Sequence, residues 1–264
     1  MTDALAPEVL VQDHGAVRLI RLQRPSAKNA LTPEVVRTLS SAISGAGADS
    51  AVRALVLSGV PGAFCSGADV RIIAQEMEAG GHAVREVLDG FQALSLGIVK
   101  LPKPVVAAVT GPAVGFGADL ALACDFRVFA ESGYLQEKFV AIGLMPDGGG
   151  SYFLTRLLGP ARALSMLMLG SRIDAAQAVS LGLASSLTAD KDAEAAALAL
   201  AATLAAGPPL SLARIKAAVH ENAAALEAAL LREREGQLAL LESADAKEGV
   251  RAFLERRTPV FKGH

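Results

Sequence analysis

Short apolar runs, glycine-rich turns and amphipathic stretches follow one another in a regular order along the first half of the chain. Apolar residues alternate over 9–11 and 17–22 on either side of His14-Gly15, which is typical of a β-hairpin. Two apolar runs, 53–59 and 105–109, have the composition of strands buried on both faces. Each run is followed by small residues and then by a helical pattern. This alternation predicts an α/β fold with a largely parallel sheet and right-handed crossovers.

Two long helices are predicted between these strands. Thr32-Pro33-Glu34 combines an N-cap residue with a proline at the first helical position, and we expect Gly45 and Gly47 to end that helix. Gly80-Gly81 interrupts the next helical region. Beyond that break, apolar residues recur along one stripe over 84–98, which indicates an amphipathic helix.

The second half of the chain changes from a mixed to a helical pattern. A third buried strand is predicted over 124–130, and beyond residue 174 only 184–187 resembles a strand. The break Gly207-Pro208-Pro209 separates an alanine-rich helix from the last helices. We therefore expect a core of residues 1–206 that holds the site and a helical region of residues 207–264.

Composition and charge narrow the possible function. The chain has 264 residues, of which 52% are hydrophobic, so it can bury a substantial core. A net charge of −2 argues against general binding to nucleic acid or to an anionic membrane. The first residues lack the basic and apolar pattern of a signal peptide, and Cys65 and Cys124 lack metal-ligand spacing. We expect a cytoplasmic protein with reduced thiols and no metal.

Two glycine-containing turns, 63–70 and 110–119, each lie between a predicted strand and a predicted helix. Such turns direct backbone N–H groups outward at a helix N-terminus. Donors from two separate turns can converge on one oxygen and form an oxyanion hole. Ala68 and Phe116 are the expected donors. Either turn alone is equally compatible with tight packing, but the matched pair favours the oxyanion hole.

Several blocks of the sequence, in this order, resemble the enoyl-CoA hydratase/isomerase (crotonase) family: LIRLQRPSAKNALTPEVV, RALVLSGVPGAFCSGADV, KPVVAAVTGPAVGFGADLALACDFRVF, FVAIGLMPDGGGSYFLTRLLG and PVFKGH. The resemblance covers nearly the whole chain. It implies a spiral of ββα units, with C-terminal helices that build homotrimers or dimers of trimers. It also implies an acyl-CoA thioester substrate whose enolate is held in the oxyanion hole. No further cofactor is implied, because coenzyme A is part of the substrate.

The same resemblance implies a binding path for coenzyme A. The residues at its matching positions are Ala27, Lys28, Ala30, Asp69, Val70, Phe261 and Lys262. The first five line the expected path of the adenine and pantetheine groups, and the last two belong to a C-terminal element that often covers the coenzyme. Lys28 and Lys262 are equally compatible with ordinary surface lysines.

Acidic residues decide which reaction the resemblance implies. Hydratases of the family hold one water between two glutamates; the first position is Asp119 here, and the second is Phe139. Asp147, in the turn Pro146-Asp147-Gly148, matches the position where several isomerases of the family carry an acid. A single carboxylate can take a proton from one carbon and return it two carbons away. The sequence therefore favours double-bond isomerisation, of the Δ3-Δ2 or dienoyl type, with Asp119 and Asp147 as candidate catalytic acids.

Three other interpretations stay open at the level of sequence. The first is hydration of a 2-trans-enoyl-CoA, and the second is a non-catalytic acyl-CoA-binding homologue. The third concerns the acids themselves: Asp147 is compatible with an N-cap of the helix at Ser151, and Asp119 with a structural acid paired with an arginine.

Overall fold

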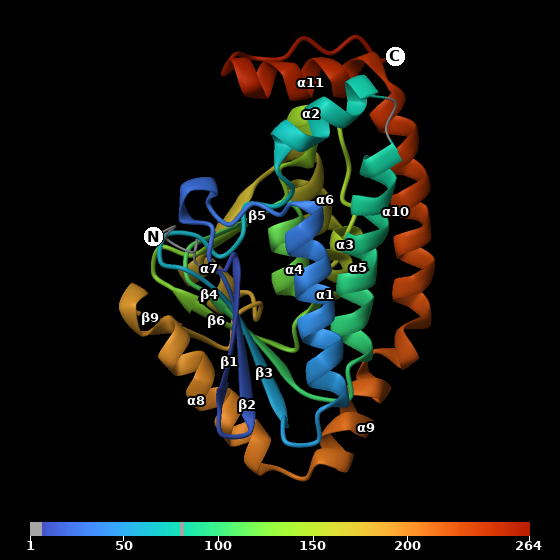
Figure 1. Ribbon diagram of the computed structural model, residues 1–264. Helices are drawn as coiled ribbons and strands as arrows, with labels where there is room; N and C mark the ends of the chain where they lie inside the picture. The colour runs from blue at the N-terminus through green and yellow to red at the C-terminus, as the bar shows by residue number, and fades with distance from the viewer. Residues whose placement is uncertain (1–6, 80–81) are drawn as a thin grey trace, which may run out of the picture.

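A six-stranded sheet runs through the middle of the molecule (Figure 1). The computed structural model describes residues 7–79 and 82–264, and the order of the strands is β1-β2-β3-β4-β6-β9. β1 and β2 pair in antiparallel fashion, and every later pair in this sheet is parallel. The hairpin and the largely parallel sheet are therefore confirmed. The strands are β1 (Val9–His14), β2 (Val17–Leu22), β3 (Ala54–Gly59), β4 (Val105–Val109), β6 (Phe126–Ala130) and β9 (Ser186–Thr188).

Helices cover both faces of this sheet. α1 (Pro33–Ala48) and α3 (His82–Lys100) contribute to the larger core on one face, and α8 (Ala193–Ala206) covers the other face (Figure 1). Every fourth residue of α8 is a buried alanine, from Ala193 to Ala205, and these small side chains let the helix pack closely on the strands.

A second, three-stranded sheet was not predicted. β5 (Pro112–Val114) pairs in parallel with β7 (Tyr134–Gln136), which pairs in antiparallel fashion with β8 (Arg172–Asp174). β5 lies inside the glycine-containing turn 110–119, where three extended residues give no readable strand pattern. Its pairing matters for the site, because Ala113 also forms a β-bridge with Cys65 of the other turn.

The end of α1 corrects one prediction. The helix does not stop at Gly45 or Gly47 but continues to Ala48, capped at its N-terminus by Thr32 as expected. Ile43 and Ala46 are buried in the core. The Nζ of Lys103 also donates hydrogen bonds to the carbonyl oxygens of Ala46 and Asp49, at 2.6 and 2.7 Å. Tertiary contacts therefore outweigh the low helix propensity of glycine.

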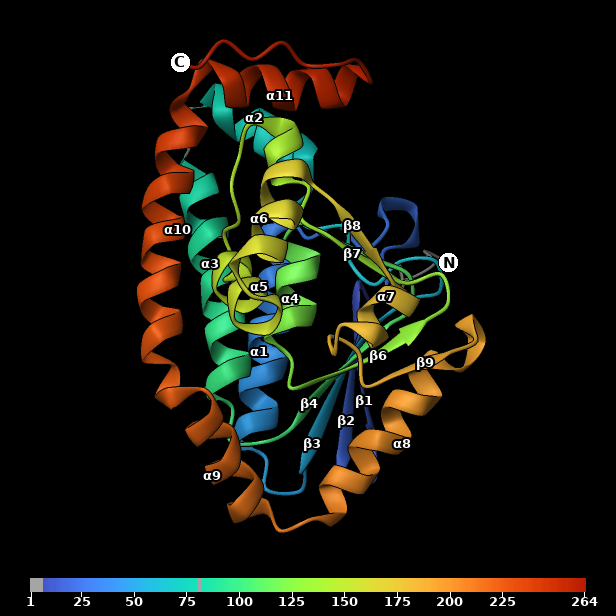
Figure 2. The same cartoon turned by 180° about the vertical axis from the view of Figure 1, so that it is seen from behind.

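The C-terminal helices form one side and one end of the molecule. α10 (Ala224–Glu242) runs along α3, and α11 (Ala244–Glu255) crosses over α2 (Val70–Ala79), as both views show (Figures 1 and 2). The predicted boundary at Gly207 falls in the turn between α8 and α9 (Pro209–Val219). The remaining elements are α4 (Phe116–Ala123), α5 (Gly150–Leu158), α6 (Pro160–Leu169), α7 (Ala175–Ser180), η1 (Pro25–Ala27), η2 (Phe139–Ile142), η3 (Asp190–Asp192) and η4 (Glu221–Ala223).

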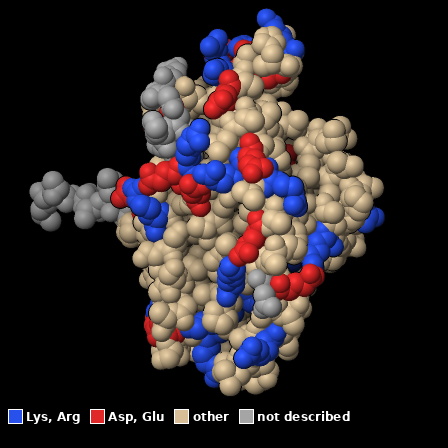
Figure 3. All heavy atoms as spheres, turned by 90° about the vertical axis from the view of Figure 1, so that its right-hand side faces the viewer, with Lys and Arg blue, Asp and Glu red and all other residues tan. Residues whose placement is uncertain are grey.

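Polar contacts fix α10 against α3. The Nε2 of Gln92 donates to the carbonyl oxygen of Leu230 at 2.6 Å, and the Nε of Arg234 lies 2.6 Å from Oδ1 of Asp89. The face that carries α10 shows acidic and basic side chains interspersed among uncharged ones (Figure 3). Exposed ion pairs of this kind stabilise a fold by about 0–1 kcal/mol each. The packing of apolar side chains therefore contributes most of the stability.

No single helix in the described ranges is long and apolar enough to cross a membrane. Only the stretches Asp190–Ala206 and Pro209–Val219 meet that criterion when taken together, and they are bent by 110°.

Candidate active site

The two glycine-containing turns meet at the centre of the molecule. Val114 N–H donates to the carbonyl oxygen of Cys65 at 2.9 Å, which joins β5 to the first turn. Gly67 has a φ of +83°, and a Cβ there would lie 2.9 Å from the carbonyl oxygen of Val114 and 3.3 Å from the nitrogen of Phe116. Only glycine permits both this backbone conformation and this approach. The first turn is thereby held against the N-terminus of α4.

Backbone N–H groups of Ala68 and Phe116 lie at these two turns. Phe116 is the first residue of α4, and Ala68 comes just before α2. Neither N–H makes a backbone hydrogen bond with another of the residues placed in the structure. Both groups are therefore available to a ligand oxygen, as an oxyanion hole requires. Their role in catalysis stays a prediction.

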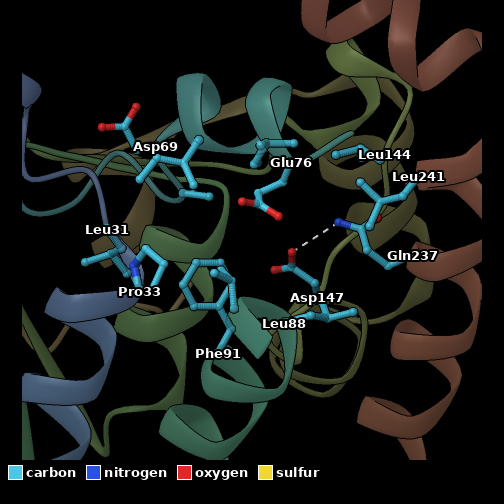
Figure 4. A pocket seen from close by; sticks show the side chains of 14 residues that line it. Leu31, Pro33, Asp69, Glu76, Leu88, Phe91, Leu144, Asp147, Gln237 and Leu241 are labelled. Carbon is cyan, nitrogen blue, oxygen red and sulfur yellow. Dashed lines mark hydrogen bonds between the residues drawn. The ribbon is translucent and has the colours of Figure 1, made fainter. Parts of the chain in front are cut away.

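Two adjacent cavities lie beside these turns, of about 30 and about 120 Å³. Figure 4 shows the first of them, with side chains from α2, α3, α10 and the loop before α5 pointing into it. Apolar groups make up most of the walls, and Asp147 is one of the few acids among them. The residues common to both cavities are Ala68, Ile73, Phe91, Leu144, Asp147 and Gln237.

Asp147 presents one carboxylate oxygen to this space. Its Oδ2 accepts a hydrogen bond from Nε2 of Gln237 at 3.1 Å (Figure 4), whereas its buried Oδ1 has no hydrogen-bond partner. Burial, and then the negative charge of Glu233, raise the pKa of Asp147 to about 8. The N-cap interpretation is wrong, because the N-cap residue of α5 is Gly149 and not Asp147.

Asp119 lies behind the same loop, outside both cavities. Its Oδ2 accepts a hydrogen bond from the N–H of Gly148 at 3.0 Å. A Cβ on Gly150 would lie 2.3 Å from Oδ1 of Asp119 and 3.1 Å from Oε1 of Glu137, so glycine is required where the loop passes over these acids. The arginine-pair interpretation is wrong, because Asp119 contacts the Glu137 carboxyl group. A direct catalytic role for Asp119 stays a prediction that the geometry does not support.

Burial raises the pKa of Asp119 and of Glu137, and the nearby carboxylates add to the shift. Two buried acids in contact are stable when they share a proton. Glu233 of α10 is also buried, and desolvation raises its pKa as well. Asp119, Glu137 and Glu233 therefore lie around the loop of residues 145–151, which carries Asp147, and the pKa of each of these four carboxyl groups is raised.

Four polar residues around the site were not assigned to it from the sequence. Gln237 and Glu233 come from α10, some ninety residues beyond the loop that they contact. Glu76 of α2 points into the cavity toward Asp147 in Figure 4. Glu137 follows β7 and pairs with Asp119. Only the spacing of Glu233 and Gln237, which puts both on one face of α10, is visible in the sequence.

The positions predicted to bind coenzyme A fall into two groups. The N-terminal group adjoins the first turn: Ser66 N–H donates to the carbonyl oxygen of Lys28 at 3.1 Å. Asp69 pairs with Arg71 and Arg24, at 3.0 and 3.8 Å, and its carboxylate points away from the cavity centre (Figure 4). Val70 lines the larger cavity, whereas Ala27, Lys28 and Ala30 line neither.

The C-terminal group lies along α11. The N–H groups of Lys262 and Gly263 donate to the two carboxylate oxygens of Asp245, at 2.6 and 2.8 Å. Neither Phe261 nor Lys262 lines the cavities beside the two turns. The coenzyme A path implied by the resemblance stays a prediction for all these residues.

An aromatic ring stands where the resemblance places a second glutamate. Phe139 begins η2, lines the larger cavity together with Ala68 and Phe116, and lies against Gly115, whose Cβ would be 3.6 Å from the ring. A phenyl group cannot hold a water molecule by hydrogen bonds. The wall of the cavity at this point is therefore apolar.

A larger cavity, of about 290 Å³, lies between α9 and the ends of the central strands. Its charged side chains are already engaged: Nζ of Lys216 lies 2.7 Å from Oδ2 of Asp125, and Arg127 donates to the carbonyl oxygen of Cys124 at 2.6 Å. This cavity is not lined by the two glycine-containing turns. The candidate active site is therefore the pair of smaller cavities, both of which are lined by Ala68.

Comparisons with known proteins agree with this geometry. The family model of enoyl-CoA hydratase/isomerase matches residues 12–264. The chain is 41% identical to a probable enoyl-CoA hydratase of Rhodobacter capsulatus, over 93% of this chain and 94% of that protein. It is 35% identical to 1,2-epoxyphenylacetyl-CoA isomerase of Escherichia coli, over 94% and 95% of the two chains.

A solved structure confirms the predicted fold. The crystal structure of an enoyl-CoA hydratase from Mycobacterium avium subsp. paratuberculosis superimposes with a TM-score of 0.87 at 34% identity, covering 97% of this chain and 99% of that one. The chain therefore belongs to the enoyl-CoA hydratase/isomerase family, and it is an enzyme of the hydratase or isomerase type with the crotonase fold.

Proposed function

We propose that this enzyme isomerises the double bond of an enoyl-CoA, of the Δ3-Δ2 or dienoyl type, through a thioester enolate. The observation that carries the proposal is the composition of the larger cavity. It brings the turns of Ala68 and Phe116 together with one carboxylate, Asp147, whose Oδ1 has no hydrogen-bond partner. Phe139 occupies the place of the second acid that a hydratase of this family uses.

Proton transfer by Asp147 accounts for every step. The carboxylate takes a proton from C2 of a 3-enoyl-CoA, and the electron pair of that C–H bond moves into the C1–C2 bond. The thioester oxygen becomes an enolate oxygen, which the N–H groups of Ala68 and Phe116 bind. The electrons then shift to form the C2–C3 double bond, and the pair of the former C3–C4 double bond takes the proton from Asp147 at C4. Nothing is oxidised or reduced.

The pKa of Asp147 predicts the pH dependence of this reaction. The base must be ionised before it can accept the C2 proton, and its pKa is raised to about 8. We expect kcat/KM to rise with pH and to level off above about 8. A raised pKa also makes the carboxyl group a good proton donor at C4, since it matches the operating pH.

Asp119 supports the loop in this proposal and does not touch the substrate. Its carboxyl group accepts the Gly148 N–H, so it fixes the residue that follows Asp147. For coenzyme A, the proposed path passes Ala27, Lys28 and Ala30, beside the first turn.

Hydration of a 2-enoyl-CoA is the second candidate function. Two observations favour it: the relative from Rhodobacter capsulatus is called a probable hydratase, and Glu76 faces Asp147 across the smaller cavity (Figure 4). Two carboxyl groups that face each other can bind one water molecule between them.

One assay separates the two reactions. Purified enzyme is mixed with a 2-enoyl-CoA and, separately, with a 3-enoyl-CoA, and the absorbance of the conjugated thioester is followed. Isomerisation predicts a gain from the 3-enoyl substrate. A loss from the 2-enoyl substrate, with no gain from the other, would establish hydration instead.

We further propose that the enzyme assembles as a homotrimer or a dimer of trimers. Large apolar side chains are exposed on α6 and α9, and Leu169 and Leu210 are 76% and 82% accessible. Exposed apolar surface of this kind marks protein–protein contacts. Light scattering would measure the mass; a monomer at micromolar concentration would contradict the proposal.

A further inference from the structure

Besides Asp119, one helix from the far end of the chain holds the loop that carries Asp147. Glu233 and Gln237 lie one turn apart on α10, and both side chains are buried. Between them lies Gly236, where the backbone of the helix comes close to Met145: a Cβ on Gly236 would be 2.4 Å from its sulfur. This face of α10 is therefore in direct contact with the start of the loop.

Glu233 binds the loop beyond Asp147. Its Oε2 accepts the N–H of Gly149 at 2.7 Å, and its Oε1 accepts the N–H and the hydroxyl of Ser151, at 2.9 and 2.5 Å. These donors lie at the N-terminus of α5, where backbone N–H groups have no partner within the helix. A carboxylate that accepts several such hydrogen bonds fixes the backbone firmly.

Gln237 binds the loop on both sides of the reactive carboxyl group. Its Oε1 accepts the N–H of Met145 at 3.1 Å, and its Nε2 donates to Oδ2 of Asp147 at 3.1 Å. The amide cannot rotate without breaking one of the two contacts. Oδ2 is thereby turned toward α10, and Oδ1 is left as the oxygen without a partner.

We propose that Glu233 and Gln237 are positioning residues, which hold the 145–151 loop and aim Oδ1 of Asp147 at the acyl group. This inference depends on the proposed function at one point, because it takes Asp147 as the base. It adds that the C-terminal helical region is part of the active site of the same chain. It also adds that α10 fixes which of the two carboxylate oxygens reacts.

The charged groups around Asp147 predict changes in its pKa that a mere loss of stability would not produce. The acids around it are Glu233 on α10, Glu76 on α2, and the Asp119–Glu137 pair behind the loop. The bases are Lys138, which lines the larger cavity, and Arg232, which acts on Glu233 from the same helix. The hydrogen bond from Gln237 lowers the pKa of Asp147, whereas the charge of Glu233 raises it. Removing the Gln237 hydrogen bond should therefore raise the pKa of Asp147, and removing the Glu233 charge should lower it.

Two variants test this signature. Gln237→Met keeps the length of the side chain but removes both hydrogen bonds, and it should move the rise of kcat/KM to higher pH. Glu233→Gln removes the charge and should move the rise to lower pH. In Gln237→Met, kcat should fall by about 10²-fold with little change in KM, since a small displacement of a reacting group costs that much. Gln92→Met is the matched control, because it breaks a hydrogen bond between α3 and α10 without contact to the loop.

A second readout does not depend on any reaction. The carboxyl carbon of Asp147 is followed by ¹³C NMR as pH is changed, with its signal assigned from Asp147→Asn. We expect a higher midpoint in Gln237→Met than in the wild type, a lower one in Glu233→Gln, and an unchanged one in Gln92→Met. Equal midpoints in all four proteins would overturn the positioning proposal even if Asp147 proves to be the base. An active Asp147→Asn variant would instead overturn the proposed function and leave the NMR result to decide the inference.

Discussion

Asp147 and Asp119 are two buried acids at the same loop, one on it and one packed against it, yet only Asp147 lines the cavities beside the two turns. The pKa of each is raised, and burial is the largest cause in both cases. Asp147 has a free Oδ1 in the cavity, whereas Asp119 is turned toward the Gly148 N–H and Glu137. A shifted pKa therefore identifies a buried acid, and access to the cavity identifies a catalytic one.

The largest effect is expected at the accessible acid. Asp147→Asn keeps the shape of the side chain and a hydrogen bond with Gln237 but removes the base, so isomerisation should fall by about 10²-fold to 10⁴-fold. The thermal midpoint should not decrease, because the neutral amide avoids the cost of a buried charge. Steady-state rates and a melting curve on the same sample measure both quantities.

The buried acid should tolerate the same change much better. Asp119→Asn keeps an acceptor for Gly148 N–H and offers an amide donor to Glu137, so we expect activity within about tenfold of the wild type. The matched pair of asparagine variants is the cleanest comparison that the chain offers. If Asp119→Asn were as inactive as Asp147→Asn, the distinction between the two acids would fail, and Asp119 would regain the catalytic role predicted from the sequence.

Local signals account for what the sequence predicted well. The Thr32-Pro33 cap, the β1–β2 hairpin and the two glycine-containing turns are each defined by neighbouring residues, and all appear in the structure. The resemblance to the family also placed Asp147 and Phe139, which the structure brings into one cavity. The cap, the hairpin and the turns lie on short segments whose local geometry depends little on the rest of the chain.

Long-range packing accounts for what the sequence could not predict. Gln237 and Glu233 reach the loop because α10 packs on α3, and nothing near residue 147 indicates this. Glu76 faces the cavity because of the orientation of α2 (Figure 4). The length of α1 beyond Gly45 depends on Lys103, which lies in a different part of the chain. Each missed feature joins segments that are far apart in sequence.

Stability should depend on pH because of the acids behind the loop. A buried acid whose pKa is raised on folding stabilises the native state below its unfolded value of about 4, and that stability is lost as pH rises through the folded value. Glu137→Gln removes one such group. Its thermal midpoint should exceed that of the wild type by a few degrees at pH 8.5, with a smaller difference at pH 5.5.

The control for that experiment is an exposed acid on α10. Glu235→Gln changes the net charge by the same amount without affecting a buried group. Its thermal midpoint should follow that of the wild type at every pH. If Glu137→Gln also followed the wild type, the Asp119–Glu137 pair would not carry the shared proton that its contact implies.

The smallest effect is expected at Glu76. Its carboxylate faces the cavity beside Asp147, so an acyl chain that ends in a carboxylate should be disfavoured (Figure 4). Partly exposed charges interact by about 1 kcal/mol or less. Glu76→Gln should therefore raise kcat/KM for an acyl-CoA with a distal carboxylate by a few-fold, about fivefold at most, relative to an uncharged acyl-CoA of equal length. An unchanged ratio would show that Glu76 does not face the acyl chain.

Loss of a deuterium label from C2 of the substrate tests the central claim most directly. A 3-enoyl-CoA that carries deuterium at C2 is incubated with the wild type and with Asp147→Asn, and the deuterium at C2 and C4 is followed by NMR. If Asp147 moves the proton through an enolate, the wild type removes deuterium from C2 as it forms the 2-enoyl product and delivers part of it to C4, and the variant removes none above the uncatalysed rate. Removal of the C2 deuterium by Asp147→Asn at the wild-type rate would contradict the assignment of Asp147 as the base.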